Sequence, residues 1–301
     1  MKYYITTAIP YVNADPHIGF ALEILYTDVM ARYQRLLGKD VYFLTGTDEH
    51  GQKIYKTAKE IGSTPEEYSA QKSAQFQKLA DLWNITNNDF IRTTEPRHME
   101  RARKFWLASL ESGDIYKKEY SGFYCYGCES FKTEKDLVDG LCPDHQRAPE
   151  IISEENYFFK LSKYQEPLEF LFNERPDFVY PTSRYNEMKN ILKNGLEDIS
   201  ISRAREKLPW GIPAPGDDTQ VMYVWFDALT NYITALGYGS DDDSLLKKYW
   251  PADAHVIGKE INRFHSLLWP AMLMSAGVEL PKQIAVHGWI TVDGQKMSKT
   301  I

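Results

Sequence analysis

Short apolar runs alternate along the first part of the chain with longer segments in which apolar residues recur every three or four positions. The runs at 3–9 and 41–44 are rich in aromatic and β-branched residues and predict buried strands. Between them, helical spacing predicts a helix from about residue 18 to 37, which Gly38 ends. The apolar residues that carry this spacing are Ile18, Leu22, Leu25, Val29, Tyr33 and Leu36.

Three more helices are predicted before residue 114, over 49–61, from 64 onward and over 96–113. The second of them begins at Thr64-Pro65-Glu66-Glu67, which offers a cap, a proline at the first helical position and an acid at the third. Strands that alternate with helices are typical of a parallel sheet covered on both faces. This pattern stops near Gly113 and returns after a proline-rich loop that ends near residue 217.

The second part of the pattern predicts strands over 221–224, 254–258 and 284–287, with helices over 225–236 and 260–276. The intervening residues include an apolar strand at 157–159 and two short helices. We therefore expect an α/β fold, a doubly wound, Rossmann-like parallel sheet formed by residues 1–114 and 218–301. An inserted small α+β domain at 115–217 splits it.

Composition places the chain among ordinary globular proteins. It has 301 residues, of which 43% are hydrophobic and 26% charged, and this length is enough for two domains or for one large domain with an insertion. A net charge of −7 argues against a general nucleic-acid coat protein, although a local basic patch is compatible with it. No apolar run is long enough to span a bilayer, and the first residues resemble a strand more than a secretory signal, so we expect a cytoplasmic protein.

All three cysteines lie in the inserted segment. Cys125, Cys128, Cys142 and His145 follow the spacing Cys-x2-Cys-x13-Cys-x2-His, which is typical of a tetrahedral zinc site. Because four protein ligands leave no position for water, we expect the zinc to be structural and to hold together a segment with little core of its own. A redox-active cysteine pair is the alternative, and it would leave one cysteine over.

Two short motifs suit a polyphosphate. His17-Ile18-Gly19 lies at the turn from the first strand to the first helix, where free N–H groups and a partial positive charge favour phosphate. Gly294-Gln295-Lys296-Met297-Ser298-Lys299 follows the last strand and places two cations on a glycine-hinged loop. Either motif alone has an ordinary explanation, a capped helix for the first and a solvated surface for the second. Together, at two ends of a nucleotide-binding fold, they indicate ATP binding.

These motifs resemble the two signature sequences of class I aminoacyl-tRNA synthetases. Segments at 46–51, 224–229 and 257–261 are similar to the methionyl-tRNA synthetase family in particular. The resemblance covers nearly the whole chain and implies activation of methionine by ATP to methionyl-adenylate, followed by transfer to tRNA(Met). It also implies Mg²⁺ with ATP, one structural Zn²⁺ in the inserted domain and a monomer.

The resemblance assigns roles to individual residues. Catalytic positions are matched by His17, Arg203, Lys296 and Lys299. The ATP-binding positions that it implies are His17, Gly19, Glu260, Gly288, Ile290, Lys296 and Lys299. The methionine-binding positions that it implies are Ile9, Tyr11, Asp48, Trp225, Ala228, Tyr232, Ile261, His265 and Trp269, with the Asp48 carboxylate holding the substrate ammonium.

The spacing of the aromatic residues is compatible with a methionine slot. Trp225, Ala228 and Tyr232 fall on one helix face, and a second set with spacing i, i+4, i+8 starts at Ile261. Two such faces at strand ends make a slot for a long, unbranched side chain, and aromatic edges suit a thioether sulfur. Without the neighbouring motifs, plain core packing would explain these stripes as well.

Two features depart from the family pattern. Phe20 stands where a second histidine of the first motif is expected, which removes a donor near the phosphates. The family's stem-contact region and anticodon-binding domain are not represented in the 301 residues, so we interpret the chain as the catalytic portion, with weak tRNA binding. A class I synthetase for another amino acid and a non-catalytic RNA-binding paralogue are the competing hypotheses.

Overall fold

A six-stranded parallel sheet forms the centre of the fold, with the strand order β3-β2-β1-β12-β13-β7. The structure is a computed structural model that describes residues 1–128, 130–132, 134–144, 146–292 and 295–296. The strands are β1 (Lys2–Thr7), β2 (Asp40–Thr47), β3 (Asp89–Arg92), β7 (Val179–Tyr180), β12 (Ala254–Gly258) and β13 (Ile284–His287). The doubly wound α/β sheet expected from the sequence is confirmed.

The apolar composition of β1 explains its central position. Ile5 lies opposite Phe43 of β2 on one side and Ala254 of β12 on the other. Ile5 and its neighbour Tyr4 are fully buried, on opposite faces, because successive residues of a strand point in opposite directions. This pairing joins the two ends of the sequence into one sheet.

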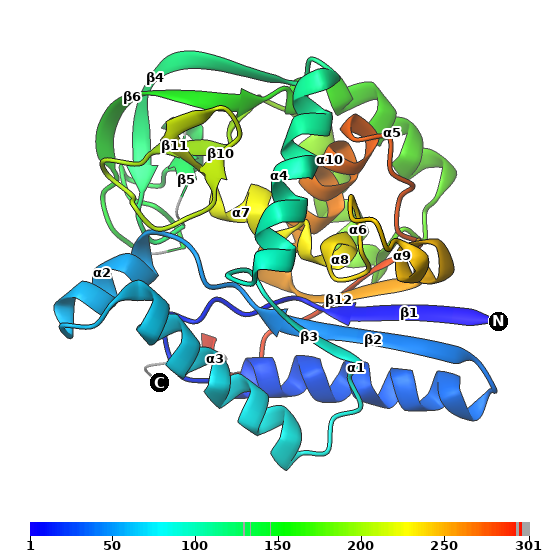
Figure 1. Ribbon diagram of the computed structural model, residues 1–301. Helices are drawn as coiled ribbons and strands as arrows, with labels where there is room; N and C mark the ends of the chain where they lie inside the picture. Colours follow the sequence, from blue (N-terminus) through cyan, green and yellow to red (C-terminus); the bar gives the residue numbers. More distant parts are fainter. Residues whose placement is uncertain (129, 133, 145, 293–294, 297–301) are drawn as a thin grey trace.

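Helices cover both faces of the sheet (Figure 1). One face carries α1 (Ile18–Leu36) and α3 (Pro65–Leu82), and α2 (Gln52–Glu60) lies next to them. The other face carries α4 (Pro96–Glu111), α7 (Val224–Ala228), α8 (Asn231–Thr234), α9 (Ser244–Tyr249) and α10 (Trp269–Ser275). The predicted cap of α3 is confirmed, because Thr64 Oγ1 accepts the Glu67 N–H at 3.2 Å and Glu67 Oε2 accepts the Thr64 N–H at 3.4 Å.

Two predicted helices are interrupted. The helix expected over 225–236 consists of α7 and α8, separated by Leu229 and Thr230. The helix expected over 260–276 consists of a 3₁₀ turn (Lys259–Ile261), a π-helical segment (Phe264–Leu268) and α10. A π-helical segment adds residues to a turn, so α-helical spacing does not predict which side chains share its face.

The inserted segment is built on a long antiparallel ribbon. β4 (Ile115–Cys125) pairs with β6 (Glu150–Phe159) from Ile115 opposite Phe159 to Tyr124 opposite Glu150. β5 (Ser130–Lys132) and β8 (Ile199–Ser200) complete a four-stranded sheet. A separate antiparallel sheet contains β9 (Ser202–Ala204), β10 (Pro213–Ala214) and β11 (Asp217–Met222). The strand expected at 221–224 is β11, which begins earlier and lies outside the parallel sheet, since its first half is polar and exposed.

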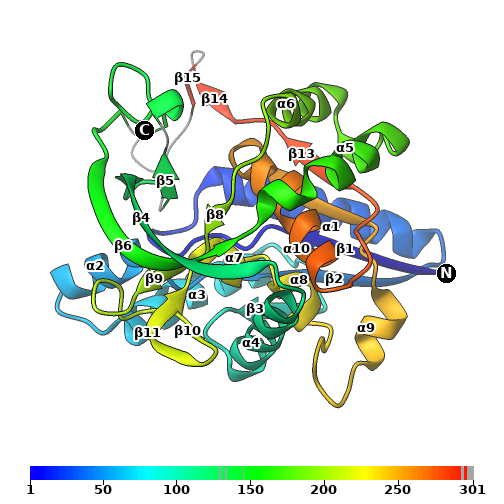
Figure 2. The same ribbon diagram turned by 90° about the horizontal axis from the view of Figure 1, so that it is seen from above.

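The edge strand β7 changes the expected division of the chain. It falls within 115–217, yet it pairs with β13 in the central sheet. Its neighbours α5 (Gln165–Glu174) and α6 (Thr182–Lys193) lie beside β13, apart from the β4–β6 ribbon (Figure 2). We therefore propose that residues 165–193 belong to the sheet domain and that 115–159 and 199–222 make up the insertion. Within the described part of the chain, no helix combines the length and the apolar composition that a membrane crossing requires.

Candidate active site

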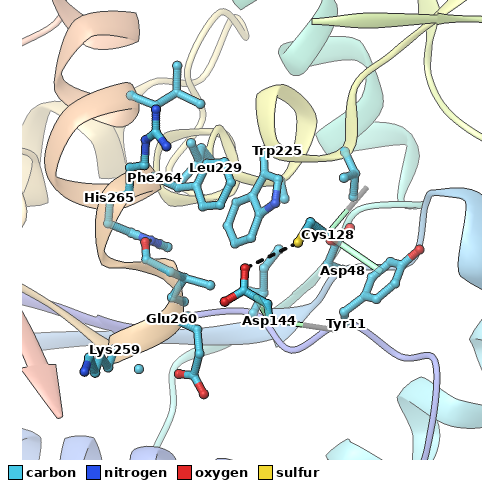
Figure 3. Close-up of a pocket in the computed structure, with 18 of the residues that line it drawn as sticks. Tyr11, Asp48, Cys128, Asp144, Trp225, Leu229, Lys259, Glu260, Phe264 and His265 are labelled. Carbon is cyan, nitrogen blue, oxygen red and sulfur yellow. Dashed lines mark hydrogen bonds between the residues drawn. The ribbon is translucent and has the colours of Figure 1, made fainter. Parts of the chain in front are cut away.

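A cavity of about 1170 Å³ opens at the carboxyl ends of the central strands. Ile9 follows β1, Asp48 follows β2, and Gly258 ends β12, and all three line it. Open parallel sheets bind their ligands at this edge. Figure 3 shows the aromatic side chains of one wall facing Asp48 and Tyr11 across the cavity.

The structure brings nearly all of the predicted site residues into this one cavity. Those that line it are Ile9, Tyr11, His17, Gly19, Asp48, Arg203, Trp225, Ala228, Tyr232, Glu260, Ile261, His265, Gly288 and Ile290. Trp269 is not among the lining residues. Lys299 and His145 lie outside the described residues, and Lys296 is described only by its place in β15 (Gln295–Lys296), which pairs with β14 (Thr291–Val292). The roles assigned to all of these residues stay predictions.

His17 caps the first helix with its own ring. Its Nδ1 accepts a hydrogen bond from the Gly19 N–H at 3.0 Å. A Cβ atom at Gly19 would lie 2.7 Å from His17 Cε1, so glycine leaves the space that the ring needs. Because Nδ1 accepts, a neutral ring carries its proton on Nε2, where it can serve a phosphate oxygen.

Phe20 packs into the interior. Its ring is buried and meets the ring of Phe76 edge-on, with the centroids 4.9 Å apart. An aromatic side chain at this position therefore strengthens the contact between α1 and α3. Core packing accounts for the residue that departs from the family motif.

Aromatic and imidazole rings form the wall of a slot. The Trp225 and Phe264 rings stack with centroids 4.0 Å apart and planes at 5°. Deeper in, the Tyr232 hydroxyl lies 2.7 Å from His265 Nε2, and His265 Nδ1 lies 3.0 Å from the Ile261 carbonyl. Since a carbonyl only accepts, His265 carries its proton on Nδ1 and accepts at Nε2 from Tyr232. Sequence reasoning missed Phe264, because the π-helical segment places it next to Trp225.

Burial keeps His265 neutral. The side chain is almost completely buried, and burial lowers the pKa of His265 to about 4. A neutral imidazole and a phenol at the end of an aromatic slot suit an uncharged, polarisable group better than a charged one.

Lowering the pH is expected to destabilise the protein through His265. The unfolded chain, with a histidine pKa near 6.5, binds this proton more readily than the folded chain. Stability therefore falls as the pH drops from about 6.5 towards 4, by up to about 3 kcal/mol. Thermal denaturation across this range should show a smaller loss for His265→Gln, which does not titrate. Equal losses in both proteins would contradict the assignment.

Trp269 supports the slot from behind. Its Nε1 donates to His255 Nε2 at 3.4 Å, and the His255 ring lies 4.2 Å from the Tyr232 ring. His255 Nδ1 lies 2.8 Å from Thr6 Oγ1. The π-helical segment before Trp269 accounts for this placement, since it shifts the tryptophan off the face that Ile261 was expected to share with it.

A buried carboxylate links the Asp48 loop to the slot. Asp227, between the slot residues of α7, lies 2.7 Å from His50 Nδ1 and 2.7 Å from His98 Nε2. Burial acts to raise the pKa of Asp227, but attraction to His50 and the hydrogen bonds from both histidines outweigh it and lower the pKa. Asp48 itself is fixed by its backbone, which accepts from Val12 and donates to Pro10. Asp48, which is expected to hold the substrate ammonium, and the aromatic slot are therefore connected by buried hydrogen bonds through His50 and Asp227.

Arg203 brings a buried positive charge to the cavity. Its Nη1 donates to Ser200 Oγ at 2.9 Å, and the guanidinium lies 5.1 Å from the Tyr124 ring and 4.7 Å from the Tyr223 ring. Burial acts to lower the pKa of Arg203, but the interactions with Tyr124 and Tyr223 outweigh it, so Arg203 stays charged. A cation held between two rings in a cavity suits a phosphate ligand.

Glu23 of α1 and His287 of β13 connect these two elements with Ala8, which follows β1. Glu23 Oε1 accepts the Ala8 N–H at 2.9 Å, and Glu23 Oε2 lies 2.9 Å from His287 Nε2. Burial raises the pKa of Glu23 despite the favourable pairing with His287. This pair fixes the end of β13, and thereby Gly288, against α1. Sequence reasoning did not identify it, because the two residues are far apart in the chain.

The cysteines converge as the spacing predicts. The sulfur atoms of Cys125, Cys128 and Cys142 all lie within 4.8 Å of one another, and those of Cys128 and Cys142 are 3.6 Å apart. Two thiolates bound to one tetrahedral zinc are separated by about 3.8 Å, whereas disulfide sulfurs are about 2 Å apart. The three thiols therefore fit a zinc ion, and the fourth ligand expected at His145 stays a prediction.

This cysteine cluster forms part of the cavity wall. Gly127, Cys128 and Asp144 line the cavity, and Asp144 Oδ2 lies 3.5 Å from Cys128 Sγ (Figure 3). Lys53 of α2 donates to the Gly127 carbonyl at 2.6 Å. The insertion thus closes over the strand ends.

Known proteins resemble the chain over its full length. The family model described as "tRNA synthetases class I (M)" matches residues 3–148 and 144–301. Methionine–tRNA ligases of Thermotoga maritima and Caldanaerobacter subterraneus are 50% and 52% identical over 100% and 99% of the chain. These matches cover 48% and 46% of the two relatives, so the chain spans about half the length of the curated relatives it matches.

A solved structure matches the fold as well. The methionyl-tRNA synthetase of Mycobacterium tuberculosis in complex with methionyl-adenylate is 44% identical, with a TM-score of 0.95. The match covers 100% of this chain and 59% of that one. The fold of the whole chain therefore recurs in a solved relative.

Proposed function

Because the chain belongs to the class I tRNA synthetases of the methionyl family, we propose that it activates methionine with ATP to methionyl-adenylate and passes the methionyl group to tRNA(Met). The observation that carries this proposal is the slot itself. An aromatic wall ends in a neutral Tyr232–His265 pair, and Asp48 faces its mouth. This arrangement suits an amino acid with an unbranched thioether side chain.

Activation needs positioning more than proton transfer. The substrate carboxylate is ionised at neutral pH and attacks the α-phosphate of ATP in line, with pyrophosphate leaving. His17 and the first turn of α1 hold phosphate oxygens, and Arg203 offers a fixed positive charge. Glu260 binds the ribose, and Gly288 and Ile290 border the base.

The remaining roles follow from the charge that develops on pyrophosphate. Lys296 and Lys299 stabilise the leaving group, and Mg²⁺ accompanies ATP as its counter-ion. The three cysteines, with His145 as the expected fourth ligand, would hold a structural zinc that keeps the insertion over the cavity and takes no part in the reaction. We propose that the chain acts as a monomer and that tRNA(Met) is its macromolecular partner.

Amino-acid-dependent ATP–pyrophosphate exchange tests the proposal. Methionine should be the only strong substrate among the twenty amino acids, and calorimetry should detect binding of both ATP and methionine. Strong exchange with another amino acid would support a synthetase for that substrate. Absence of ATP and methionine binding by the folded chain would support a non-catalytic paralogue.

Replacing Asp227 by asparagine is expected to raise KM for methionine about tenfold while KM for ATP changes little. An amide oxygen can accept from one imidazole, but the amide NH₂ cannot accept from the second, so α7 loses part of its anchor. A tenfold change corresponds to about 1.4 kcal/mol. Exchange kinetics with each substrate varied in turn measure both constants. Equal changes in the two would contradict a role confined to the methionine slot.

A further inference from the structure

Two lysines of α2 contact the turn between the first two cysteines. Lys53 Nζ donates to the Gly127 carbonyl at 2.6 Å, and Lys56 Nζ lies 4.0 Å from the centre of the Tyr126 ring. The two lysines are three residues apart, so they lie on the same side of the helix. Tyr126 and Gly127 separate the first two cysteines of the predicted zinc site. One side of α2 therefore contacts both residues of this 126–127 turn.

The start of α2 is fixed by the sheet domain and by the insertion. Trp210 of the insertion donates from Nε1 to the Glu49 carbonyl at 2.6 Å, and its ring centre lies 5.2 Å from that of His50. The buried Glu49 carboxylate accepts from Arg92 Nε at 2.7 Å and from Arg92 Nη2 at 2.9 Å. In the first turn of the helix, Ile54 packs into the core. Because its first residues are fixed in this way, α2 gives the two lysines a rigid support.

The cysteine-bearing segment 126–150 contributes little apolar core. Of its residues whose burial the structure describes, Cys142 alone is buried. A metal ion on the cysteines would fix the segment internally but would not fix its position relative to the sheet. Cys128 and Asp144 of this segment line the cavity that Asp48 and Tyr11 also line (Figure 3). The position of this part of the cavity wall therefore depends on contacts with the sheet domain.

We propose that Lys53 and Lys56 are positioning residues, which hold the 126–127 turn against α2 and so keep closed the cavity wall that excludes water from methionyl-adenylate. This role rests on the proposed function, because it concerns the intermediate of that reaction. Neither lysine is assigned a part in the chemistry, and both act through the turn that they contact.

Water destroys an acyl-adenylate. Its oxygen bonds to the carbonyl carbon, the bond from that carbon to the phosphate oxygen breaks, methionine and AMP leave, and two protons pass to the solvent. Enzymes protect reactive intermediates by excluding water from the closed site. A charged donor makes a stronger hydrogen bond than a neutral one, so Lys53, which donates to a carbonyl, is the residue whose loss should have the larger effect.

Limited proteolysis of the zinc-loaded protein tests the attachment without reference to activity. With a protease that does not cleave at lysine, Lys53→Met should raise the rate of cleavage within 126–150 about tenfold, because it removes a hydrogen bond with a charged donor. Zinc content should stay at the wild-type value. Lys53→Arg keeps a donor at this position and should restore slow cleavage. Cleavage of Lys53→Met at the wild-type rate would overturn the proposal.

AMP formation in the absence of tRNA tests the exclusion of water. Relative to ATP–pyrophosphate exchange, Lys53→Met should release AMP from ATP and methionine about tenfold faster than wild type, with both KM values within about twofold. A raised KM with an unchanged AMP ratio would show that Lys53 contacts a substrate directly and would overturn the proposal. Wild type without methionine-dependent exchange would refute the proposed function and with it the exclusion of water, whereas the proteolysis result refutes the attachment alone.

Lys59→Met is the matched control. Lys59 follows Lys56 by three residues on the same helix and is exposed. Among the residues that the structure describes, no hydrogen bond, ion pair or ring contact involves its ammonium. Its substitution should therefore leave the cleavage rate and the AMP ratio within about twofold of wild type. Equal effects of Lys53→Met and Lys59→Met would overturn the proposal, because the loss of any charge on α2 would then suffice.

Discussion

Replacing Asp48 by alanine is expected to lower kcat/KM for methionine in ATP–pyrophosphate exchange about a thousandfold. The Asp48 side chain is 7% exposed and borders the cavity beside Tyr11. An ammonium bound there without its counter-charge is a buried, uncompensated ion, which costs about 3–5 kcal/mol. Each 1.4 kcal/mol corresponds to about a factor of ten, so the loss reaches about three orders of magnitude.

The backbone around Asp48 makes this prediction specific. The Asp48 N–H donates to the Pro10 carbonyl, and its carbonyl accepts from Val12, so the carboxylate leaves a fixed point between β1 and β2. Truncation of the side chain leaves these two bonds intact. Asp48→Asn, which keeps the shape and removes the charge, should lie between wild type and Asp48→Ala.

A second acid on the neighbouring loop provides the control. Asp15 is exposed and pairs with Lys72, so Asp15→Ala should change kcat/KM less than twofold. Thermal denaturation and KM for ATP establish that Asp48→Ala is folded and binds nucleotide. If that variant retains exchange activity close to wild type, Asp48 does not hold the ammonium.

The sequence predicted the fold where local signals sufficed. The apolar runs of β1, β2, β12 and β13 and the capping box at Thr64 all have purely local causes, and the structure confirms them. The spacing of the cysteines is also a local signal, because short turns set the distance between metal ligands in the sequence. Neither the short edge strand β3, which is half polar, nor β7, which has two residues, gives a local signal of this strength.

The site could be predicted only in part, for two physical reasons. Periodicity reveals that a helix has an apolar stripe but not which side meets the sheet, and in α1 the inward side holds hydrogen-bonded Glu23 and Asp28. The π-helical segment changes the number of residues per turn, which brings Phe264 to the slot and leaves Trp269 behind it. Pairs such as Asp227 with His98 depend on the tertiary fold and have no signature in a single sequence.

Removal of zinc is expected to unfold the cysteine-bearing part of the insertion and to lower exchange activity at least tenfold. Of the residues in 126–150 whose burial the structure describes, Cys142 alone is buried, so these residues contribute little apolar core. Binding of a structural zinc supplies about 10–16 kcal/mol in small domains of this kind, far more than any other interaction here. Activity falls because Gly127, Cys128 and Asp144 form part of the cavity wall.

Cys142→Ser and a chelator should give the same result by different routes. The purified wild type should contain one zinc per chain, and either treatment should remove it and open the 126–150 segment to limited proteolysis. The central sheet keeps its own two clusters of buried residues, so the main thermal transition should shift much less than the proteolysis rate. Glu150 lies at the end of the same ribbon and is exposed, so Glu150→Gln should leave zinc content and proteolysis unchanged. Zinc-free protein with slow proteolysis and full activity would show that the three thiols serve another purpose, such as a redox pair.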